Sequence, residues 1–429
     1  MLIPRDIYLN RLIDRMNNGM IKVITGIRRC GKSFLLFDLF YAYLLRTGIP
    51  AEQIIRIALD DEDQKELKDP DKLYTFIKNS IKNNDDPYYI FIDEAQFAIS
   101  HEELKNKDKP IRLYGLLNGL LRRKNVDMYI TGSNSKFLST DVATEFRGRG
   151  DEIHIAPLSF SEYAPVFPGN HFEAFYQYIL YGGMPHILSE KSDEARVRYL
   201  KHLNDEIYLK DIIERYNIKN ISGMEEVMKI TASSIGSLTN AKKISDTFTS
   251  KGQKDLSLPS INNYLRYLRE SFILEKAERY DIKGRKYINA QAKYYYTDTG
   301  LRNALLNFRQ FEETHLMENI IYNELIYRGF NVDVGIVEIS AIQESKQIRK
   351  QLVVDFTANL GSRRYYIQSA YAIPDLQKME QEQASLIRIP DSFKKIIVVN
   401  NYSPLWRNES GITIMNIYDF LLKPNSLDL

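Results

Sequence analysis

The fold is decided by a short stretch near the amino terminus, which reads Gly26-Ile27-Arg28-Arg29-Cys30-Gly31-Lys32-Ser33. An apolar run, 21–25, comes directly before it, and a long apolar segment, 34–45, follows it. The run is typical of a buried strand and the segment of a helix, so both glycines lie in a turn between the two. Backbone N–H groups in such a turn surround phosphate oxygens, helped by the positive end of the helix. The stretch predicts a phosphate-binding loop.

The polar residues of this loop have separate expected roles. Lys32 neutralises the β and γ phosphates of a nucleotide, while the Ser33 hydroxyl binds Mg²⁺. Arg29 adds positive charge at the same place, for phosphate binding or for pairing with a local carboxylate. Cys30 could be a redox switch, but a small residue filling a variable loop position is the simpler interpretation. With the two glycines, the nucleotide-binding set is Gly26, Arg29, Gly31, Lys32, Ser33 and Asp93, and Ser33 and Asp93 are its metal ligands.

A second motif strengthens the prediction. The apolar run 88–92 ends in Asp93 and Glu94. In this arrangement the first carboxylate holds Mg²⁺ through water, and the second activates the attacking water. A solvated strand end is the alternative, but the phosphate loop upstream favours catalysis. Glu94 therefore indicates nucleotide hydrolysis and not binding alone.

Two further segments offer catalytic side chains. The run 128–131 reads as another strand, and Ser133 or Asn134 after it could orient the water or sense the γ-phosphate; an ordinary capped turn is the alternative. Farther along, Arg147 and Arg149 lie on a glycine-flanked loop. One of them could reach the γ-phosphate of a neighbouring subunit in a homo-oligomer, or both could be solvated.

Strand and helix signals divide the chain. The first 165 residues alternate strands with helices, which predicts a parallel sheet covered by helices. Residues 166–222 read as a helical lid or connector. Residues 223–304 give three helices and then two strands, the order of a winged helix. Residues 305–429 read as a separate α/β domain.

Six segments, 26–33, 91–94, 131–133, 157–162, 182–185 and 297–301, occur in the same order in a bacterial and archaeal family, the AAA-like P-loop ATPases, which the chain as a whole resembles. That family has a C-terminal winged helix and a restriction-endonuclease-like domain. The resemblance implies a multidomain α/β protein that binds ATP and Mg²⁺.

The resemblance also implies a nuclease fold at the C-terminus, and its residues require checking. A nuclease of this fold needs an acidic residue on one strand and Glu-x-Lys on the next. Asp355 fills the first position, and Glu318 lies on the preceding helix. Gln368 stands where the second carboxylate belongs, and Ala370 where the lysine belongs. We therefore expect this domain not to cut DNA.

The predicted winged helix carries a local positive charge. Residues 240–293 include twelve basic and six acidic residues, a local net charge of +6. One predicted helix has an apolar face, formed by Ile261, Leu265, Leu268 and Phe272, and a polar face with Asn262, Arg266 and Arg269. Contact with duplex DNA is the functional interpretation; a solvated face or a protein-binding surface is the alternative.

Composition limits the remaining choices. Hydrophobic residues make up 44% and charged residues 27% of 429, which is typical of a folded protein and excludes a disordered chain. Net charge is +2, too small for wholesale coating of nucleic acid or a membrane. The single cysteine and the absence of a signal-peptide or membrane-spanning run favour the cytoplasm.

These observations predict a Mg²⁺-dependent ATPase that acts as a switch or small motor on a winged helix and an inactive nuclease-like domain. Two alternatives stay open: an ATP-regulated nuclease, and a scaffold that binds nucleotide without hydrolysis. A GTPase is disfavoured because no Asn-Lys-x-Asp motif follows the loop. The protein partner is not indicated.

Overall fold

In the computed structural model the described residues are 3–83, 85–100, 102–103, 111–132, 146, 148–250, 256–343 and 346–429. The chain forms two compact units. The first contains residues 1–157 and 270–272, and the second contains residues 158–269 and 273–429. Among the described residues, no helix is long and apolar enough to cross a lipid bilayer.

The first unit is built on a five-stranded parallel sheet, as the alternation of strands and helices predicts. Its strand order is β2-β3-β4-β1-β5. The strands are β1 (Ile21–Thr25), β2 (Ile54–Ala58), β3 (Tyr88–Asp93), β4 (Val126–Thr131) and β5 (Gly150–His154). Every pair in this sheet is parallel, so the carboxyl ends of all five strands meet at one edge.

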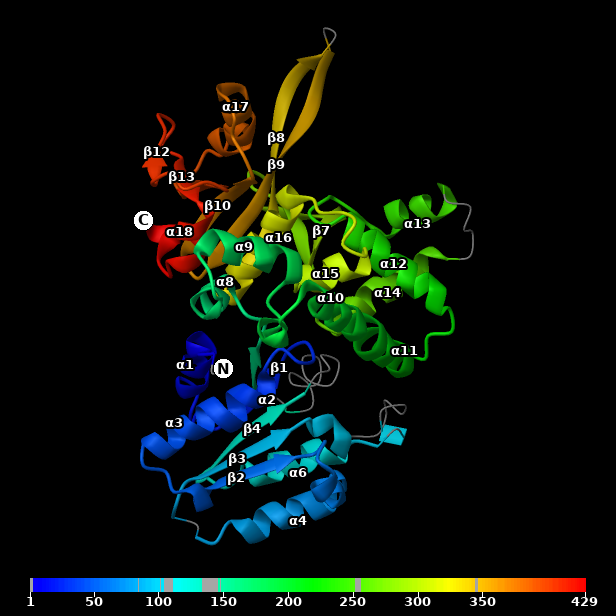
Figure 1. The fold of residues 1–429 in the computed structure, drawn as a ribbon, viewed down its shortest axis with the longest axis vertical. Helices are drawn as coiled ribbons and strands as arrows, with labels where there is room; N and C mark the ends of the chain where they lie inside the picture. The colour runs from blue at the N-terminus through cyan, green and yellow to red at the C-terminus, as the bar shows by residue number, and fades with distance from the viewer. Residues whose placement is uncertain are drawn as a thin grey trace. The chain divides into compact units, whose positions relative to one another are not determined.

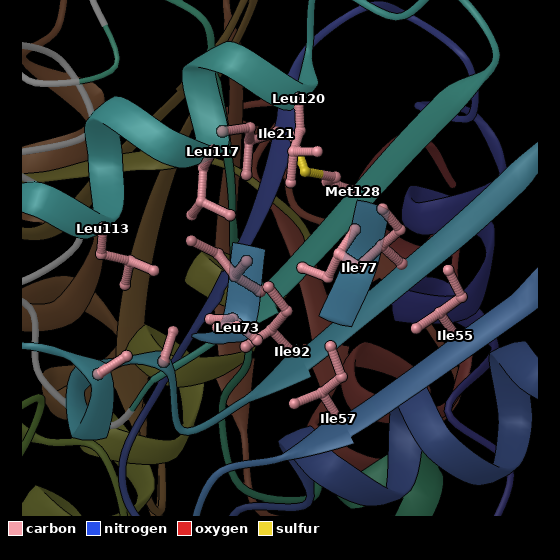
Figure 2. Packing of buried hydrophobic residues seen from close by; sticks show 14 of the residues in the cluster. Ile21, Ile55, Ile57, Leu73, Ile77, Ile92, Leu113, Leu117, Leu120 and Met128 are labelled. Carbon is pink, nitrogen blue, oxygen red and sulfur yellow. The ribbon is translucent and has the colours of Figure 1, made fainter. Parts of the chain in front are cut away.

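Helices cover both faces of this sheet (Figure 1). One face packs against α4 (Pro70–Ser80) and α6 (Arg112–Leu120). Their leucine and isoleucine side chains meet those of the strands in a single buried cluster, shown in Figure 2. The other face meets a continuous helical segment made of α2 (Lys32–Phe34), a π-helical stretch (Leu35–Phe40) and α3 (Tyr41–Arg46). There Phe40 contacts Phe91 and Tyr129 of the strands. α1 (Asp6–Ile13) contacts the π-helical stretch and β5.

The second unit begins with helices. They are α8 (Phe160–Tyr163), α9 (His171–Tyr181), α10 (Asp193–His202), a π-helical stretch (Leu203–Leu209), α11 (Lys210–Tyr216), α12 (Ile221–Ser233), α13 (Ala241–Ser250) and α14 (Leu258–Glu270). The hairpin of β6 (Leu274–Asp281) and β7 (Lys286–Tyr296) follows α14. Phe272, which the sequence places on the apolar face of α14, lies beyond the end of that helix with φ 57°.

An eight-stranded sheet organises the rest of this unit, in the order β12-β13-β11-β10-β9-β8-β6-β7. Its later strands are β8 (Asn331–Gln343), β9 (Lys346–Leu360), β10 (Arg363–Ala370), β11 (Lys394–Val399), β12 (Trp406–Arg407) and β13 (Thr413–Asn416). The helices are α15 (Thr299–Leu305), α16 (Glu313–Tyr327), α17 (Leu376–Ile387) and α18 (Ile417–Leu422). Because β6 pairs in parallel with β8, the β6-β7 hairpin and the strands of the last hundred residues form one sheet.

Candidate functional site

The phosphate loop joins β1 to α2 in a conformation that requires glycine. Gly26 has φ 145°, and a Cβ atom at this position would lie 2.2 Å from the carbonyl oxygen of Ile155. Gly31 has φ 101°, which also falls in the region that favours glycine. Arg29 adopts φ 64° with an exposed side chain. Both glycines of the motif are therefore explained by backbone geometry.

Lys32 lies against the inner side of this loop. Its ammonium donates to the carbonyl oxygens of Gly26, at 2.9 Å, and Ile27, at 3.1 Å. The side chain is 4% exposed. Ser33, one residue later, is exposed in the first turn of the helix. A nucleotide phosphate requires a positive charge and backbone N–H groups, which Lys32 and the glycine-containing loop provide. Mg²⁺ requires an oxygen ligand, which the exposed Ser33 provides. These residues therefore fit both.

Cys30 packs inside the domain. It is fully buried, and its Sγ donates to the carbonyl oxygen of Ile155 at 3.4 Å. Burial in a hydrogen-bonded position favours a packing role over a redox switch.

Thr131 contacts both acidic residues at the end of β3, the carboxylate of Asp93 and the backbone of Glu94. Its hydroxyl donates to Oδ1 of Asp93 and accepts from the backbone N–H of Glu94 at 3.0 Å. Asp93 is 5% exposed. Glu94 has a left-handed backbone, with φ 50°, and its Oε2 accepts from the amide of Gln96. These contacts fix the directions of both carboxylates, and a lone threonine at a strand end gave no sequence signal for this role.

The acidic pair and the phosphate loop both lie at the carboxyl ends of the parallel strands. β4 lies between β3 and β1, so two strand spacings separate Asp93 from Thr25, or about 10 Å. The parallel sheet therefore brings together the two motifs, which lie sixty residues apart in the sequence.

The neighbouring strand β5 adds a polar group that the sequence did not predict. The Thr25 hydroxyl donates to Oε1 of Glu152 at 2.8 Å and lies 3.1 Å from Nδ1 of His154. Burial, with lesser contributions from Lys32 and Arg11, lowers the pKa of His154 to about 4. His154 is therefore neutral near pH 7. Burial likewise raises the pKa of Glu152, against the Thr25 hydrogen bond.

Arg5 is a second residue that the sequence did not indicate. It is 3% exposed. Its guanidinium donates from Nη1 to the carbonyl oxygen of Cys30 at 3.1 Å and from Nη2 to that of Ala156 at 2.7 Å. The phosphate loop is thus attached to the segment that follows β5.

Arg149 lies at the opposite end of the parallel strands, just before the amino end of β5. The backbone N–H of Ile21 donates to its carbonyl oxygen at 2.8 Å, and β5 then pairs with β1 from Ile21 to Thr25. The Arg149 side chain is exposed, at the amino end of β1, whereas the phosphate loop follows the carboxyl end. Its backbone therefore stands about six strand residues, or roughly 20 Å, from the start of the loop of its own chain. Asn134 and Arg147 lie outside the described residues, as does Ser133.

The predicted faces of α14 are confirmed. Ile261, Leu265 and Leu268 are buried, and Asn262, Arg266 and Arg269 are exposed. The charge count for 240–293 requires a correction, because Arg279 is 7% and Lys293 is 5% exposed. These two cations belong to the interior and not to a basic surface.

Lys293 lies between two carboxylates. Its ammonium donates to Glu318 Oε1 at 2.7 Å and to Asp355 Oδ1 at 2.8 Å. Ala370 belongs to a hydrophobic cluster with Tyr366 and Leu386. Gln368 Oε1 accepts from the Asp355 backbone N–H at 3.4 Å. The amine next to these acids therefore comes from β7 and not from β10, which the sequence did not predict.

Comparison with known proteins identifies the class of the first unit. A family model described as an AAA domain matches residues 18–164. A second model, described as a domain of unknown function (DUF8612), matches residues 172–312. Together with the parallel sheet and the phosphate loop, the first match defines an AAA domain of the P-loop, nucleotide-binding class.

Relatives extend the likeness to the whole chain. An uncharacterized protein of Haemophilus influenzae is 32% identical over 427 residues, which cover 98% of this chain and 99% of that protein. The chain belongs to the same family as this protein. The uncharacterized protein MJ1544 of Methanocaldococcus jannaschii is 27% identical over 399 residues, which cover 89% of this chain and 80% of that one.

A solved structure, the Orc1 protein of Aeropyrum pernix in complex with DNA, gives a TM-score of 0.28 at 13% identity. The aligned region covers 72% of this chain and 93% of the Orc1 chain. A score this low carries no argument about fold or function.

Proposed function

We propose that the protein is a Mg²⁺-dependent ATPase whose nucleotide state controls its second unit. The observation that carries this proposal is the position of Thr131, whose hydroxyl contacts both Asp93 and the backbone of Glu94. An acidic pair fixed in this way, at the edge of the sheet that carries Lys32, has the arrangement that phosphoryl transfer to water requires.

Binding would be divided between the loop and the acidic pair. Lys32, released from the loop carbonyls, would neutralise the β and γ phosphates, and the loop N–H groups would donate to their oxygens. Ser33 and Asp93 would hold the Mg²⁺ ion, directly and through water. When bound, that ion neutralises charge on the phosphates.

Hydrolysis would depend on Glu94. Its carboxylate accepts a proton from the attacking water at Oε1 or Oε2, which makes the water oxygen a better nucleophile. Gln96, which donates to Oε2, would orient this carboxylate. Asn134, after β4, would orient the same water.

The charge that develops in the transition state requires a further cation. Arg149 lies at the wrong edge of the sheet to reach its own phosphate loop, so we propose that Arg147 or Arg149 acts on the loop of a neighbouring subunit. This role implies a homo-oligomer.

The proposed output lies in the second unit. We assign 166–222 to a helical connector, 223–304 to a winged helix and 305–429 to a nuclease-like domain, beside an ATPase core over 1–165. Support for the winged helix comes from the order α12, α13, α14, β6, β7 and from the backbone pairing of Thr239 with Ala292, before α13 and in β7. The exposed face of α14 would contact duplex DNA.

We propose that the nuclease-like domain does not cut. Support comes from Gln368 and Ala370, which supply neither a second carboxylate nor an amine to the acids Glu318 and Asp355. The domain would then transmit or bind, and the chemistry of the protein would be limited to ATP.

One experiment tests the whole proposal. ATP turnover is measured with and without duplex DNA, the mass of the protein is determined in each nucleotide state, and the DNA is recovered afterwards. We expect Mg²⁺-dependent phosphate release and intact DNA. Absence of turnover in every condition would favour a nucleotide-binding scaffold, and cut DNA would favour an ATP-regulated nuclease.

A further inference from the structure

Three elements of the second unit meet at one buried ammonium group. Lys293 comes from β7, Glu318 from α16 and Asp355 from β9. The exposed fractions of the three residues are 5%, 6% and 7%. The distances from the Lys293 Nζ to the two carboxylate oxygens, 2.7 and 2.8 Å, are those of charge-assisted hydrogen bonds.

Both carboxylates are held in place by other donors as well. Glu318 Oε1 also accepts from the Tyr295 hydroxyl at 2.6 Å. Asp355 Oδ2 accepts from the backbone N–H of Ser369 at 3.0 Å. One oxygen of each carboxylate therefore points at the same location from a fixed direction, and a cation at that location contacts both.

Electrostatics shows what this location requires. Burial lowers the pKa of Lys293, but Asp355 and Glu318 outweigh burial and raise it above its usual value. Two carboxylates and one ammonium leave one net negative charge in the cluster. His315 lies 3.9 Å from Glu318, and the interaction with that carboxylate raises the pKa of His315. Without Lys293, two buried carboxylates would face each other uncompensated, which is strongly unfavourable.

We propose that the ammonium of Lys293 occupies the position of a divalent cation, so that the second unit contains a metal position filled by its own side chain. Paired carboxylate oxygens are ligands that Mg²⁺, Mn²⁺ and Ca²⁺ prefer. Within the described ranges, no group of three or more His, Cys, Asp or Glu side chains could hold a metal ion. The metal that a nuclease fold would need does not fit here, because lysine already satisfies both carboxylates.

This position has a structural consequence. A metal bound here would make the joining of β7, α16 and β9 depend on the concentration of the ion, whereas lysine makes it permanent. The hairpin that follows α14 already pairs with β8 through its backbone, and Lys293 adds a side-chain contact to α16 and β9 that needs no ligand. The inference rests only on contacts inside the second unit and is independent of ATP hydrolysis.

The test is a variant that removes the ammonium and keeps the shape. In Lys293→Met, the nucleotide-free protein should lose thermal stability and regain part of it when Mn²⁺ is added, with a Mn²⁺-binding event in calorimetry. Wild-type protein should show neither response. Adding Asp355→Asn to Lys293→Met should abolish the Mn²⁺ response, because one carboxylate is then missing.

Each other outcome counts against the proposal. If Mn²⁺ stabilises the wild-type protein and Glu318→Gln removes that effect, the cluster is a native metal site. A folded Lys293→Met protein without a Mn²⁺ response shows that the carboxylates do not form a cation position. If Lys293→Met fails to fold with or without Mn²⁺, the proposal is overturned, and the variant Lys293→Met with Glu318→Gln and Asp355→Asn identifies the cause. Folding of this neutral variant would show that the two carboxylates repel each other and that Mn²⁺ cannot bind between them. Its failure to fold would assign Lys293 a packing role.

Discussion

Arg5 donates from Nη1 to the carbonyl oxygen of Cys30, so a residue before the first helix is bonded to the phosphate loop. The same guanidinium reaches Ala156, whose N–H donates to the Tyr8 hydroxyl at 3.0 Å. Arg5 therefore connects the Cys30 end of the loop to the segment after β5. It is a positioning residue for the phosphate loop, and its partners Cys30 and Ala156 both lie within the first unit.

Arg5→Ala should weaken ATP binding more than it slows the chemical step. Hydrogen bonds to charged groups contribute about 1.5–3 kcal/mol each, and about 1.4 kcal/mol corresponds to tenfold in affinity. We therefore expect the Kd for ATP to rise about tenfold or more, with a smaller fall in kcat. Calorimetric titration and steady-state turnover measure the two effects. The exposed Arg46 provides a matched control, and an equal loss in Arg46→Ala would remove the assigned role.

Lys32 and Glu94 should give opposite defects. Lys32→Ala removes the counter-ion of the phosphates and should abolish binding or turnover. Glu94→Gln keeps the shape of the side chain but cannot accept a proton from water, so it should bind ATP normally and lose hydrolysis, by about a hundredfold or more. Phosphate release and nucleotide binding are measured on the same preparations. Normal turnover in Glu94→Gln would show that another group activates the water.

The sequence predicted those features whose geometry is set by local spacing. Gly26 and Lys32 belong to one short motif, Asp93 ends an apolar run, and the two faces of α14 follow from helical periodicity. In each case the residues that decide the structure lie within about a dozen positions of one another. Such patterns can be read without knowledge of the fold.

Contacts between distant parts of the chain could not be predicted in this way. Arg5 bonds to a residue 151 positions away, and Lys293 to one 62 positions away, so neither pairing leaves a spacing signal. Strand β5 was missed for a different reason. It lies at the edge of the sheet, where Asp151 and Glu152 are tolerated, and its composition resembles a loop.

Mixing experiments should decide whether Arg149 acts between subunits. Arg149→Ala should bind ATP normally and hydrolyse it slowly, because a transition-state cation is missing. If the arginine serves a neighbouring loop, mixing Arg149→Ala with Lys32→Ala protein should restore part of the turnover, since some interfaces then combine an intact loop with an intact arginine. Turnover per subunit of the wild-type protein should fall on dilution. Concentration-independent turnover by a strict monomer would exclude this role.

His154 should make the first unit sensitive to acid. Its pKa is about 4 in the folded protein, below the ordinary value of 6.5, so the unfolded chain binds the proton more tightly. The contribution of neutral His154 to the free energy of unfolding is complete above pH 6.5. It is lost as the pH falls from 6.5 toward 4, by about 1–3 kcal/mol in total. Thermal midpoints at pH 7 and pH 5 test this. In His154→Gln, which cannot titrate, the difference between the two midpoints should shrink, and an unchanged difference would assign the acid sensitivity to other groups.

The exposed face of α14 should bind duplex DNA through Arg266 and Arg269 if the winged-helix proposal is correct. Affinity should fall as salt rises, with a log–log slope of about −0.9 for each phosphate neutralised. An arginine that reads a base edge would lose about 1–3 kcal/mol on replacement by alanine and relax the sequence preference, whereas one that contacts a phosphate would weaken every sequence alike and flatten the slope by about one unit. Arg198→Ala removes an exposed arginine of α10 and serves as the control. Fluorescence anisotropy with labelled duplexes measures all four proteins in ATP and in ADP. Absence of binding at low salt in both states would assign this face to a protein contact, and the burial of Arg279 and Lys293 already reduces the basic surface available for DNA.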